Sequence, residues 1–504
     1  MFHLFLDDVA LTIIPSHPEI EKSLTYVERT MELDERQPWK GTKVRQRNAK
    51  AFEDEPKEET VERIIKFFGE ANISRREIGR GIETHQGAWR IVTDKIREMG
   101  MPYKLHDIRL PFPKPRLDLI HGLRFSQEPL LKQFLSQNMS GILEAPTRFG
   151  KSYLIGNTLR AYSRLPTVVT VPGSDLVEQL YDDLRAMLVG RNVKVIGSGI
   201  KGSAKFSGDD VTVCSMDSLY KCDVGKIELL VIDEIQSAVT DDRLADIVKF
   251  HKARRLGFSA TTGGRFDGRD ILIEALIGPT LARRTFREAV DEGAICDIVV
   301  IMIRVNIPPT GRFSQRHKMY AHVLHENPHI GEIVRWLTTQ IIPPDWQTIG
   351  FIKTEASAEF FKSFVPGSEI AMAKLFPNKE ARREMMRRMA SGELKRCLAS
   401  DIYSQGVTFS DLRCMINLAG GGPYFGSVQK PGRLAQVRPG KKAGIMFDFY
   451  LTTNNQWDPR AAGEHLFSIL NQSAKRLEVY QSRGYKIIHV ETPRQLKEAL
   501  TPFM

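Results

Sequence analysis

The sequence predicts an α/β protein in which two tandem parallel-sheet domains follow a smaller α+β domain. Two separate series of short β-rich runs alternate with helical stretches, and such alternation is typical of a parallel sheet covered on both faces. A proline-rich segment separates the first series from an N-terminal region of different character. With 504 residues and 42% hydrophobic content, the chain can form roughly three domains of about 150 residues each.

The N-terminal domain is expected over residues 1–112. It opens with an apolar, strand-like stretch ending near Ile14 and continues through charged residues into two helical patterns, VERIIKFF at 61–68 and WRIVTDKIREMG at 89–100. Proline disfavours helix interiors and central strands, so the three prolines of LPFPKPRLD indicate a linker that ends this domain.

The first parallel-sheet domain is expected over residues 118–295. Its strand candidates are short runs rich in β-branched and other apolar residues. They are GILEAP at 141–146, TVVTVP at 167–172, VKVIGS at 193–198, VTVCS at 211–215, LLVIDE at 229–234 and RLGFSA at 255–260.

The second parallel-sheet domain is expected over residues 300–460, after a boundary segment near 305–315. Residues 461–504 are expected to add a helix, a strand (KIIHVE) and a closing helix packed on it. The strand candidates of the domain are QTIGFIK at 347–353, RCLAS at 396–400, CMINLAG at 414–420 and AGIMFDFY at 443–450.

Charge and cysteine content narrow the class of protein. The 72 Lys and Arg exceed the 61 Asp and Glu and give a formal net charge of +11, which suits a polyanionic partner; a merely solvated basic surface is the alternative. Five scattered cysteines without a CxxC pair indicate neither a disulfide framework nor a zinc site and favour a reducing cytoplasm. The N-terminal FHLFLDDVA is too short and acidic for a signal peptide, and no apolar run approaches the roughly 20 residues that span a bilayer, so no membrane insertion is expected.

The segment GILEAPTRFGKS at 141–152 has the strand, loop and helix order of a phosphate-binding loop. Backbone amides at the helix start can cradle phosphates, Lys151 can neutralise the β and γ phosphates of a nucleotide, and the Ser152 hydroxyl can join a Mg²⁺ shell. Arg148 and Phe149 stand where such loops often carry a small residue. They either reshape the loop entrance or, for Phe149, belong to the core, and the loop alone leaves a chance match open.

A pair of carboxylates follows the apolar strand in LLVIDEIQ. Asp233 and Glu234 stand at the carboxyl end of that strand, where ligands gather in parallel sheets. Asp233 would hold Mg²⁺, and Glu234 would orient and deprotonate an attacking water. Two solvated strand-end carboxylates are the alternative, but GKS and VIDE in this order are much harder to obtain by chance than either motif alone.

Three further stretches complete a set of motifs. VPGSDLVEQ at 171–179 has the spacing PxxxLxxQ, SAT stands at 259–261 after a strand, and LRFSQ at 123–127 lies just ahead of the phosphate loop. In order and spacing, these stretches together with GKS and VIDEIQ resemble the motifs of superfamily 2 helicases and translocases. The resemblance implies an engine of two RecA-like domains, with ATP and Mg²⁺ as cofactors and nucleic acid as partner.

The resemblance also implies roles for individual residues of the first engine domain. Gln127 is similar to an adenine-reading glutamine, with Arg124 nearby. The loop residues expected at the nucleotide are Pro146, Thr147, Arg148, Phe149, Gly150, Lys151 and Ser152. Those expected at the nucleic acid are Pro172, Gly173, Ser174, Gln179 and Ser215. Ser259 and Thr261 resemble residues that couple hydrolysis to domain movement. Gln236 stands at another such position, where it replaces the more familiar His or Asp after DEx.

In the second engine domain, TIGFIKTEASAEFF at 348–361 resembles the opening strand and helix and places Lys353 near nucleic acid. LASDIYSQGVTF at 398–409 resembles motif V. Asp401 and Gly406 match the motif, and Gly406 is expected at the nucleotide. Ser404 and Gln405 are expected at the nucleic acid.

QKPGRLAQVRPG at 429–440 resembles motif VI, usually written QxxGRxxR. Gln429 and Arg433 match, and Arg433 is the candidate arginine finger that stabilises charge on the transferred phosphate. The final arginine of the pattern falls on Gln436. Either Arg438 replaces it through a backbone shift, or the protein works with one finger.

The motifs leave the nucleic-acid substrate open. VIDEIQ and VPGSD depart from the pattern of DEAD-box RNA helicases and are more similar to the DNA-acting branch, which includes restriction-enzyme motor subunits. In compactness, in the size of the N-terminal domain and in the spacing after motif VI, the chain most resembles UvsW-type branch-migration helicases of tailed bacteriophages. That resemblance implies unwinding or branch migration of forked and Holliday-type DNA in recombination, repair and replication. It also implies a cytoplasmic location, in the host if phage-encoded, and a monomer as the simplest state.

Two other functions stay open from the sequence. One is an RNA helicase, and the other is an ATP-binding nucleic-acid clamp with little turnover, which the departure at Gln436 motivates. Basic and aromatic residues of the N-terminal domain are compatible with a grip on duplex DNA, although solvated charges and a core Trp explain them equally well. They are Trp39, Lys40, Lys43, Arg45, Arg47, Arg75, Arg76 and Arg80.

Overall fold

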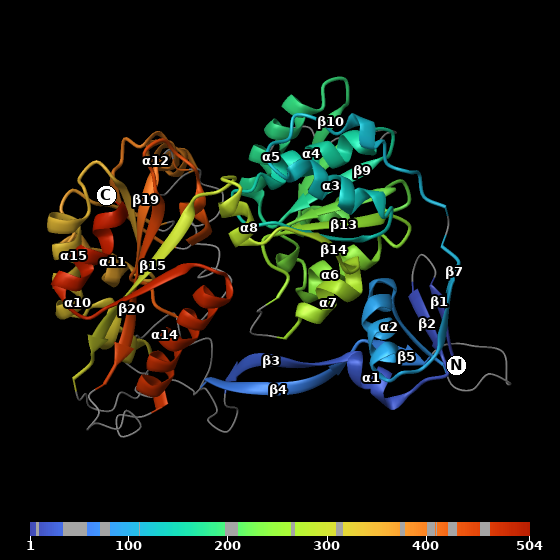
Figure 1. Cartoon of the computed structure of the whole chain (residues 1–504), viewed down its shortest axis with the longest axis horizontal. Helices are drawn as coiled ribbons and strands as arrows, with labels where there is room; N and C mark the ends of the chain where they lie inside the picture. Colours follow the sequence, from blue (N-terminus) through green and yellow to red (C-terminus); the bar gives the residue numbers. More distant parts are fainter. Residues whose placement is uncertain are drawn as a thin grey trace, which may run out of the picture. The chain divides into compact units, whose positions relative to one another are not determined.

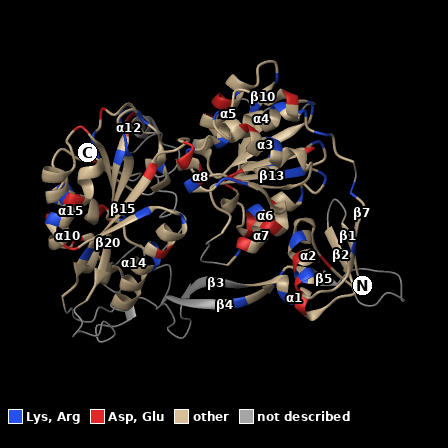
Figure 2. Cartoon of the chain, in the orientation of Figure 1, with Lys and Arg blue, Asp and Glu red and all other residues tan. Residues whose placement is uncertain are grey.

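The computed structural model contains three main sheets, one small and two large (Figure 1). It describes residues 1–6, 10–33, 58–70, 81–109, 111–196, 210–263, 268–308, 316–372, 379–400, 409, 411–421, 431–453 and 464–503. Lys and Arg are spread over the described fold and interleaved with Asp and Glu (Figure 2). The basic and aromatic residues singled out in the N-terminal domain, Trp39 to Arg47 and Arg75 to Arg80, lie outside the described residues.

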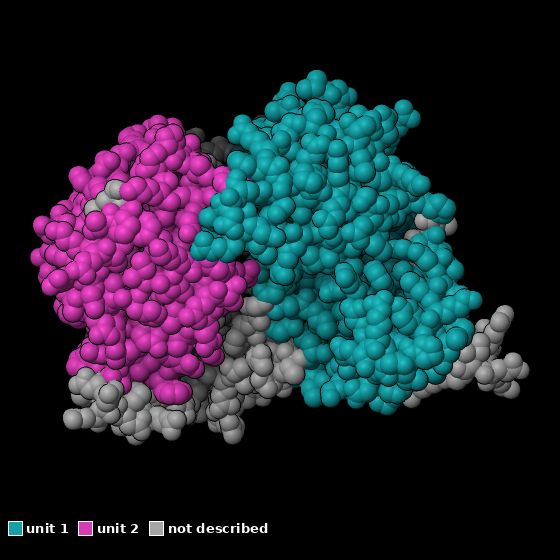
Figure 3. Space-filling model, viewed as in Figure 1, with its two compact units in different colours: residues 1–31, 60–292 teal, residues 32–59, 293–504 magenta. Residues whose placement is uncertain are grey.

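The chain divides into two compact units (Figure 3). The first comprises Met1–Met31 and Thr60–Glu292, and the second comprises Glu32–Glu59 and Gly293–Met504. The first unit holds the small sheet and one large sheet, and the second holds the other large sheet.

The small sheet has the strand order β5-β6-β2-β1-β7 and is mixed, because β1 and β7 pair in parallel and the other pairs are antiparallel. Buried apolar side chains alternate along β1, and together with Leu11 and Ile13 of β2 they form a core with helix α2. The elements are β1 Phe2–Leu6, β2 Ala10–Ile14, α1 Pro18–Ser23, β3 Thr25–Leu33, β4 Glu58–Lys66, β5 Phe68–Glu70, β6 Ile82–His85, η1 Gln86–Ala88, α2 Trp89–Glu98 and β7 Tyr103–Asp107. This confirms the predicted α+β domain.

The helix predicted at 61–68 is wrong. The segment lies in strand β4, which pairs with β3 as a two-stranded ribbon, and continues into β5. Val61, Ile64 and Ile65 are β-branched and favour an extended backbone, and eight residues are too few for a helical period to be distinguished from a strand.

Within the first unit the small domain packs on helix α7 (Asp270–Ile277) of the large sheet. Gly87 is required at this contact, because a Cβ there would lie 2.3 Å from the carbonyl oxygen of Glu274 and 2.6 Å from that of Ala275. The Arg255 guanidinium also donates to the Gln86 side-chain oxygen at 3.1 Å, and both side chains are buried. Close backbone approach and a buried hydrogen bond therefore join the two sheets of this unit.

The large sheet of the first unit is all parallel, with strand order β10-β11-β9-β12-β13-β8-β14. Most of its residues are buried on both faces, as Val- and Ile-rich runs in parallel sheets require. Its strands are β8 Gly141–Glu144, β9 Thr167–Val171, β10 Val193–Ile196, β11 Val211–Ser215, β12 Leu229–Asp233, β13 Arg254–Ser259 and β14 Thr280–Arg283. All six expected runs are strands, and β14 is an addition.

Helices cover both faces of this sheet, with α3, α4 and α5 on one side and α6 and α7 on the other (Figure 1). On the first side Phe134 of α3 packs edge-on against Phe258 of β13, and on the second Ile247 and Ile273 join the core over β12. The remaining elements are η2 Leu117–Leu119, α3 Gln127–Ser136, α4 Lys151–Ala161, α5 Ser174–Met187, η3 Met216–Lys221, η4 Ile235–Ser237, α6 Asp241–Val248 and α8 Phe286–Asp291.

The second large sheet is also all parallel, with strand order β17-β18-β16-β19-β20-β15-β21. Its strands are β15 Asp297–Asn306, β16 Gln347–Phe351, β17 Glu369–Ala371, β18 Arg396–Ala399, β19 Leu412–Asn417, β20 Ala443–Thr452 and β21 Lys486–Val490. The ten-residue β15 lies between β20 and β21 and was not among the expected strands of this domain.

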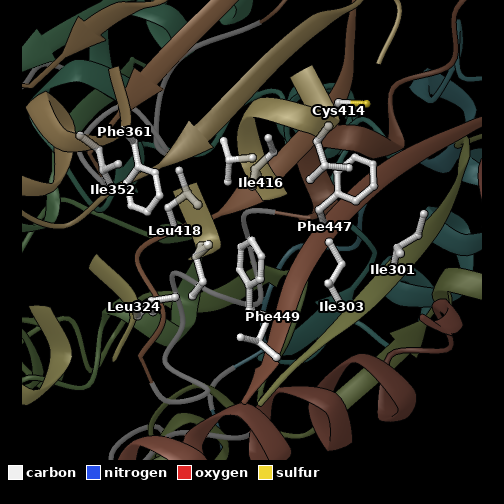
Figure 4. Packing of buried hydrophobic residues seen from close by; sticks show 14 of the residues in the cluster. Ile301, Ile303, Leu324, Ile352, Phe361, Cys414, Ile416, Leu418, Phe447 and Phe449 are labelled. Carbon is white, nitrogen blue, oxygen red and sulfur yellow. The ribbon is translucent and has the colours of Figure 1, made fainter. Parts of the chain in front are cut away.

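The core of the second unit lies on the faces of this sheet (Figure 4), where Ile416 and Leu418 from β19 and its end meet Phe447 and Phe449 of β20. Its helices are α9 Arg316–Tyr320, η5 Ala321–His325, α10 Pro328–Trp336, η6 Leu337–Ile341, α11 Glu355–Lys362, α12 Lys379–Ser391, η9 Arg433–Ala435, α14 Glu464–Ser482, α15 Pro493–Leu500 and η11 Thr501–Phe503. Two seven-stranded parallel sheets with helices, and a small mixed sheet before them, confirm the predicted fold class of two tandem RecA-like domains.

The five cysteines are free thiols in buried positions. Among the described helices, none combines the length and apolar character needed to cross a membrane.

Candidate nucleotide-binding site

The loop from Ala145 to Gly150 joins β8 to α4 at the carboxyl edge of the first large sheet. Gly150 has φ of 92° and Arg148 has φ of 72°, so two left-handed residues bend the chain into the N-terminus of α4. Phe149 is only 2% exposed, which makes it a core residue and leaves the loop entrance to its neighbours. The loop thus turns its backbone where phosphate loops do, although Arg148 is not a glycine.

Gln127 closes the loop from the side. Its side-chain oxygen accepts from the Arg124 backbone N–H at 2.8 Å, and its amide nitrogen donates to the Phe149 carbonyl oxygen. A Cβ on Gly150 would lie 2.6 Å from that amide nitrogen, so this position also requires glycine for space. One amide hydrogen and one oxygen lone pair of Gln127 remain for a nucleobase.

The catalytic candidates of the two central motifs meet in one place. Lys151 Nζ lies 3.2 Å from Glu234 Oε1, and both side chains are largely buried. Burial and then the neighbouring Glu234 charge raise the pKa of Asp233 to about 7, whereas Lys151 lowers it. Glu234 has φ of 50°, a strained backbone for a non-glycine residue and one that is common at functional sites.

A chain of hydrogen bonds leads from Glu234 to the expected coupling residues. The Gln236 amide donates to Glu234 Oε2 at 2.7 Å, and its oxygen lies 2.5 Å from the Ser259 hydroxyl. That hydroxyl also accepts from the Thr261 backbone N–H at 2.9 Å. The chain connects the ends of neighbouring strands β12 and β13, so a change at Glu234 reaches the SAT segment through two side chains.

The residues present fit a magnesium ion. The donor set would be the Asp233 carboxylate and the Ser152 hydroxyl, and Mg²⁺ in nucleotide sites takes few protein oxygens and completes its shell with phosphates and water. The raised pKa of Asp233 favours a compensating cation. No group of three or more His, Cys, Asp and Glu that could cage a metal occurs within the described ranges.

Two residues of the site were missed in the sequence. Glu144 is 6% exposed and accepts from Arg283 at 3.0 Å and from the Thr262 hydroxyl at 3.3 Å, so it ties the start of the phosphate loop to β14 and the residue after SAT. Phe125 has φ of 52° and is 55% exposed, two residues before Gln127. The sequence shows only an aromatic residue two positions before Gln127, and its exposure and its positive φ become visible in the structure.

The residues expected at nucleic acid in this unit follow the neighbouring strands β9 and β11. Ser174 and Gln179 are exposed on α5, and Pro172 and Gly173 are partly exposed ahead of it. Ser215 is 8% exposed, and its hydroxyl lies 3.0 Å from that of Ser218. The structure brings these two loops to one edge of the sheet, whereas Ser215 itself faces inward.

In the second unit, the turn that carries Arg433 is fixed to the sheet by Lys441. Its ammonium donates to the carbonyl oxygens of Leu412 and Leu434 at 2.7 and 2.6 Å, and burial lowers its pKa to about 8. With its amide turned to match its neighbours, Gln436 donates to the Phe409 carbonyl at 2.9 Å and accepts from Arg438 Nη2 at 2.6 Å. Gln436 thus binds the guanidinium of Arg438, the residue considered as a replacement for the motif VI arginine that is missing at position 436.

Other expected residues of this unit are only partly visible. Lys353 is exposed, with its Nζ 5.9 Å from the centre of the Tyr320 ring. Asp401, Ser404, Gln405, Gly406 and Gln429 lie outside the described residues.

Comparisons with known proteins agree with this fold. A family model described as "Type III restriction enzyme, res subunit" matches residues 120–263. The chain is 23% identical over 370 residues to the DNA 3'-5' translocase XPB2 of Sulfurisphaera tokodaii, covering 65% of this chain and 81% of that protein.

Two solved structures share the fold. The ATP-dependent Type ISP restriction-modification enzyme LlaBIII bound to DNA has a TM-score of 0.52 at 14% identity, over 82% of this chain and 35% of that one. S. cerevisiae Dbp5 bound to RNA and ADP BeF3 has a TM-score of 0.51 at 15% identity, over 78% of this chain and all of that one, 100%.

The phosphate loop, the paired carboxylates and the two RecA-like sheets define an enzyme that hydrolyses ATP. More narrowly, the chain is similar in sequence to a restriction-enzyme res subunit over residues 120–263 and to a DNA translocase, and both similarities support a helicase or translocase of superfamily 2.

Proposed function

We propose that the protein is an ATP-driven motor on DNA that unwinds or branch-migrates forked and Holliday-type structures. The relative with the matched sequence is named a DNA translocase, and LlaBIII, with which the fold is shared, is described as bound to DNA. The departures of VIDEIQ and VPGSD from the DEAD-box pattern favour the same substrate. Branch migration itself rests on the resemblance to UvsW-type helicases, and it places the protein in recombination, repair and replication in a cytoplasm.

The contact between Lys151 and Glu234 is the observation that carries the motor function. A γ-phosphate at the helix start would compete for Lys151 and release Glu234, which then orients the attacking water and accepts its proton. Because Gln236 bonds both Glu234 and Ser259, release of the carboxylate changes the hydrogen bonds at Thr261. Hydrolysis is thereby linked to the segment after β13.

Asp233 and Ser152 would hold Mg²⁺, which neutralises charge on the phosphates when bound. Gly150 and its neighbours would contact the phosphates through the backbone, with Gln127 at the adenine. Arg433 would stabilise charge on the transferred phosphate, and Lys441 holds its turn in place. Since Gln436 already binds Arg438, we propose that Arg433 acts as the one finger.

The nucleic-acid substrate is tested by ATP hydrolysis with Mg²⁺ alone and then with single-stranded DNA, duplex, a four-way junction and RNA. Strong stimulation by the junction is expected, and the DNA concentration needed should rise steeply with salt because phosphate contacts release counterions. Greater stimulation by RNA than by DNA would indicate that RNA is the substrate. Negligible turnover that Arg433→Ala does not lower further would indicate the clamp.

Phe125 is expected to stack on the adenine. Phe125→Ala should raise the KM for ATP about tenfold with little change in kcat, because base stacking on an aromatic ring contributes about 1–3 kcal/mol. Steady-state kinetics checks this, and Phe125→Trp should behave like the wild type. Tyr220, an aromatic exposed to a similar 62%, offers a control: an equal rise in KM for Tyr220→Ala would contradict a specific role for Phe125.

A further inference from the structure

We propose that Arg243 is a positioning residue that couples the loop after the catalytic carboxylates to the two loops expected at the nucleic acid. The inference rests on the proposed function, because it assigns these loops to the DNA track. Arg243 lies in the first turn of α6 and was not anticipated from any sequence motif.

The guanidinium of Arg243 contacts three separate segments. Its Nε donates to Asp217 Oδ1 at 2.8 Å, its Nη1 to the Ser237 carbonyl oxygen at 2.8 Å and its Nη2 to the Pro172 carbonyl oxygen at 3.2 Å. Its side chain is 20% exposed, whereas that of Asp217 is 66% exposed. Two of the three acceptors are therefore backbone groups, whose positions a side-chain rotation cannot change.

The three segments follow three consecutive strands of the sheet. The strand order contains β11-β9-β12, and Asp217, Pro172 and Ser237 stand just beyond the carboxyl ends of these strands in that order. Pro172 is the second residue of the VPGSD stretch, Asp217 comes two residues after Ser215, and Ser237 directly follows Gln236. One cation thus spans the two expected nucleic-acid loops and the loop that contains the coupling glutamine.

Arginine is suited to this position because its planar fork presents donors in fixed directions. A shift of Gln236 that accompanies loss of the Glu234 bond moves Ser237, its neighbour in η4, and the fork transmits that shift to Pro172 and Asp217. By linkage, the free energy by which bound nucleotide changes the affinity for nucleic acid equals the free energy by which nucleic acid changes the affinity for nucleotide.

A second arginine at the same helix provides a matched control. Arg269 donates to the Val239 carbonyl at 3.2 Å and to Asp241 Oδ1 at 2.7 Å, so it also anchors the start of α6. Among these contacts none reaches the loops after β9 and β11. Arg269 therefore serves for comparison as a second arginine that anchors the start of α6.

The experiment measures ATP hydrolysis by the full chain against polynucleotide concentration for wild type, Arg243→Ala, Arg243→Lys and Arg269→Lys. For Arg243→Ala we expect basal kcat to stay within about twofold, stimulated kcat to fall about tenfold and half-maximal stimulation to need more polynucleotide, as for a coupling of typical size. Arg243→Lys should restore stimulation only in part, because a single ammonium replaces a three-way fork. Arg269→Lys should keep full stimulation.

Unchanged stimulation in both Arg243 variants would overturn the inference, as would an equal fall of basal and stimulated rates, which indicates a structural role. If Arg243→Ala does not fold, the same comparison is made with Arg243→Lys, with its Tm measured beside that of Arg269→Lys. Failure of the proposed function would give a different result, because no DNA would then stimulate ATP hydrolysis by the wild type. If RNA stimulates the wild type instead, the same comparison of the Arg243 and Arg269 variants is made with RNA as the polynucleotide.

Discussion

Replacing Glu234 with Gln is expected to lower the ATP turnover number by about 10²–10⁴-fold while the fold and nucleic-acid binding persist, because only the proton acceptor is lost. The substituted amide can still accept from Gln236, which now lies 2.7 Å from the carboxylate. Turnover is measured at saturating ATP and Mg²⁺ with the best stimulating nucleic acid, and strand displacement is measured in parallel.

Lys151→Ala should have an effect of similar size for a different reason. Lys151 is the cation beside Glu234, and it also lowers the pKa of Asp233, so its loss removes the phosphate contact and leaves the two carboxylates without a nearby positive charge. If Lys151 binds the phosphates as proposed, ATP binding should weaken in this variant, whereas Glu234→Gln should bind ATP at least as well as the wild type. Equilibrium binding of a fluorescent nucleotide separates the two variants.

Asp242→Asn provides the control for both changes, because Asp242 is an exposed carboxylate in the first turn of α6 and undergoes the same chemical substitution as Glu234. It should retain turnover and strand displacement. Normal strand separation by Glu234→Gln would refute the assignment of Glu234 as the base that activates water.

The sequence predicted most of the fold because strands of a parallel sheet carry a strong local signal. Runs such as TVVTVP and LLVIDE are rich in Val, Leu and Ile, and each forms a strand whose side chains are largely buried on both faces. The helix predicted at 61–68 was wrong because eight residues are too few to distinguish a helical period from a strand period. DIVVIMIRVN at 297–306 has the same apolar character as the predicted strands, but it lies where the first series of alternating strands and helices ends and the second begins.

The candidate site also contains residues that the sequence predicted and residues that it did not. Lys151, Asp233 and Glu234 belong to contiguous motifs, and the structure brings Lys151 and Glu234 within 3.2 Å. Glu144 and Arg243 have no motif, since their partners are distant in the chain: Glu144 bonds Thr262, and Arg243 bonds Pro172. Such contacts follow from strand order, which places sequence-distant loops side by side and leaves no local pattern.

Replacing Asp448 with Ala is expected to destabilise the second unit by about 3–5 kcal/mol, the cost of leaving a buried arginine unpaired. Asp448 and Arg476 are 0% and 3% exposed, and their contacts are bidentate at 2.9 and 3.0 Å. Tyr480 also donates to Asp448 at 2.8 Å. Removal of the carboxylate therefore leaves a buried cation and a buried hydroxyl without their acceptor.

Denaturant unfolding followed by tryptophan fluorescence measures this effect, since Trp336 and Trp346 belong to the second unit and Trp346 is buried. Glu498→Ala breaks an exposed pair with Arg494 and should leave the transition almost unchanged. The double change Asp448→Leu with Arg476→Met should cost much less than Asp448→Ala, because it removes both charges at once. Equal transitions for Asp448→Ala and wild type would contradict the assignment of a buried, interdependent pair.

The double change separates stability from function. Arg476 also donates to the Gly421 carbonyl oxygen at 2.6 Å, and Gly421 lies in the turn after β19 with φ of 87°. If Asp448→Leu with Arg476→Met restores the unfolding transition but not stimulated ATP turnover, the buried pair also contributes to catalysis. Full recovery of both assigns the pair to stability alone.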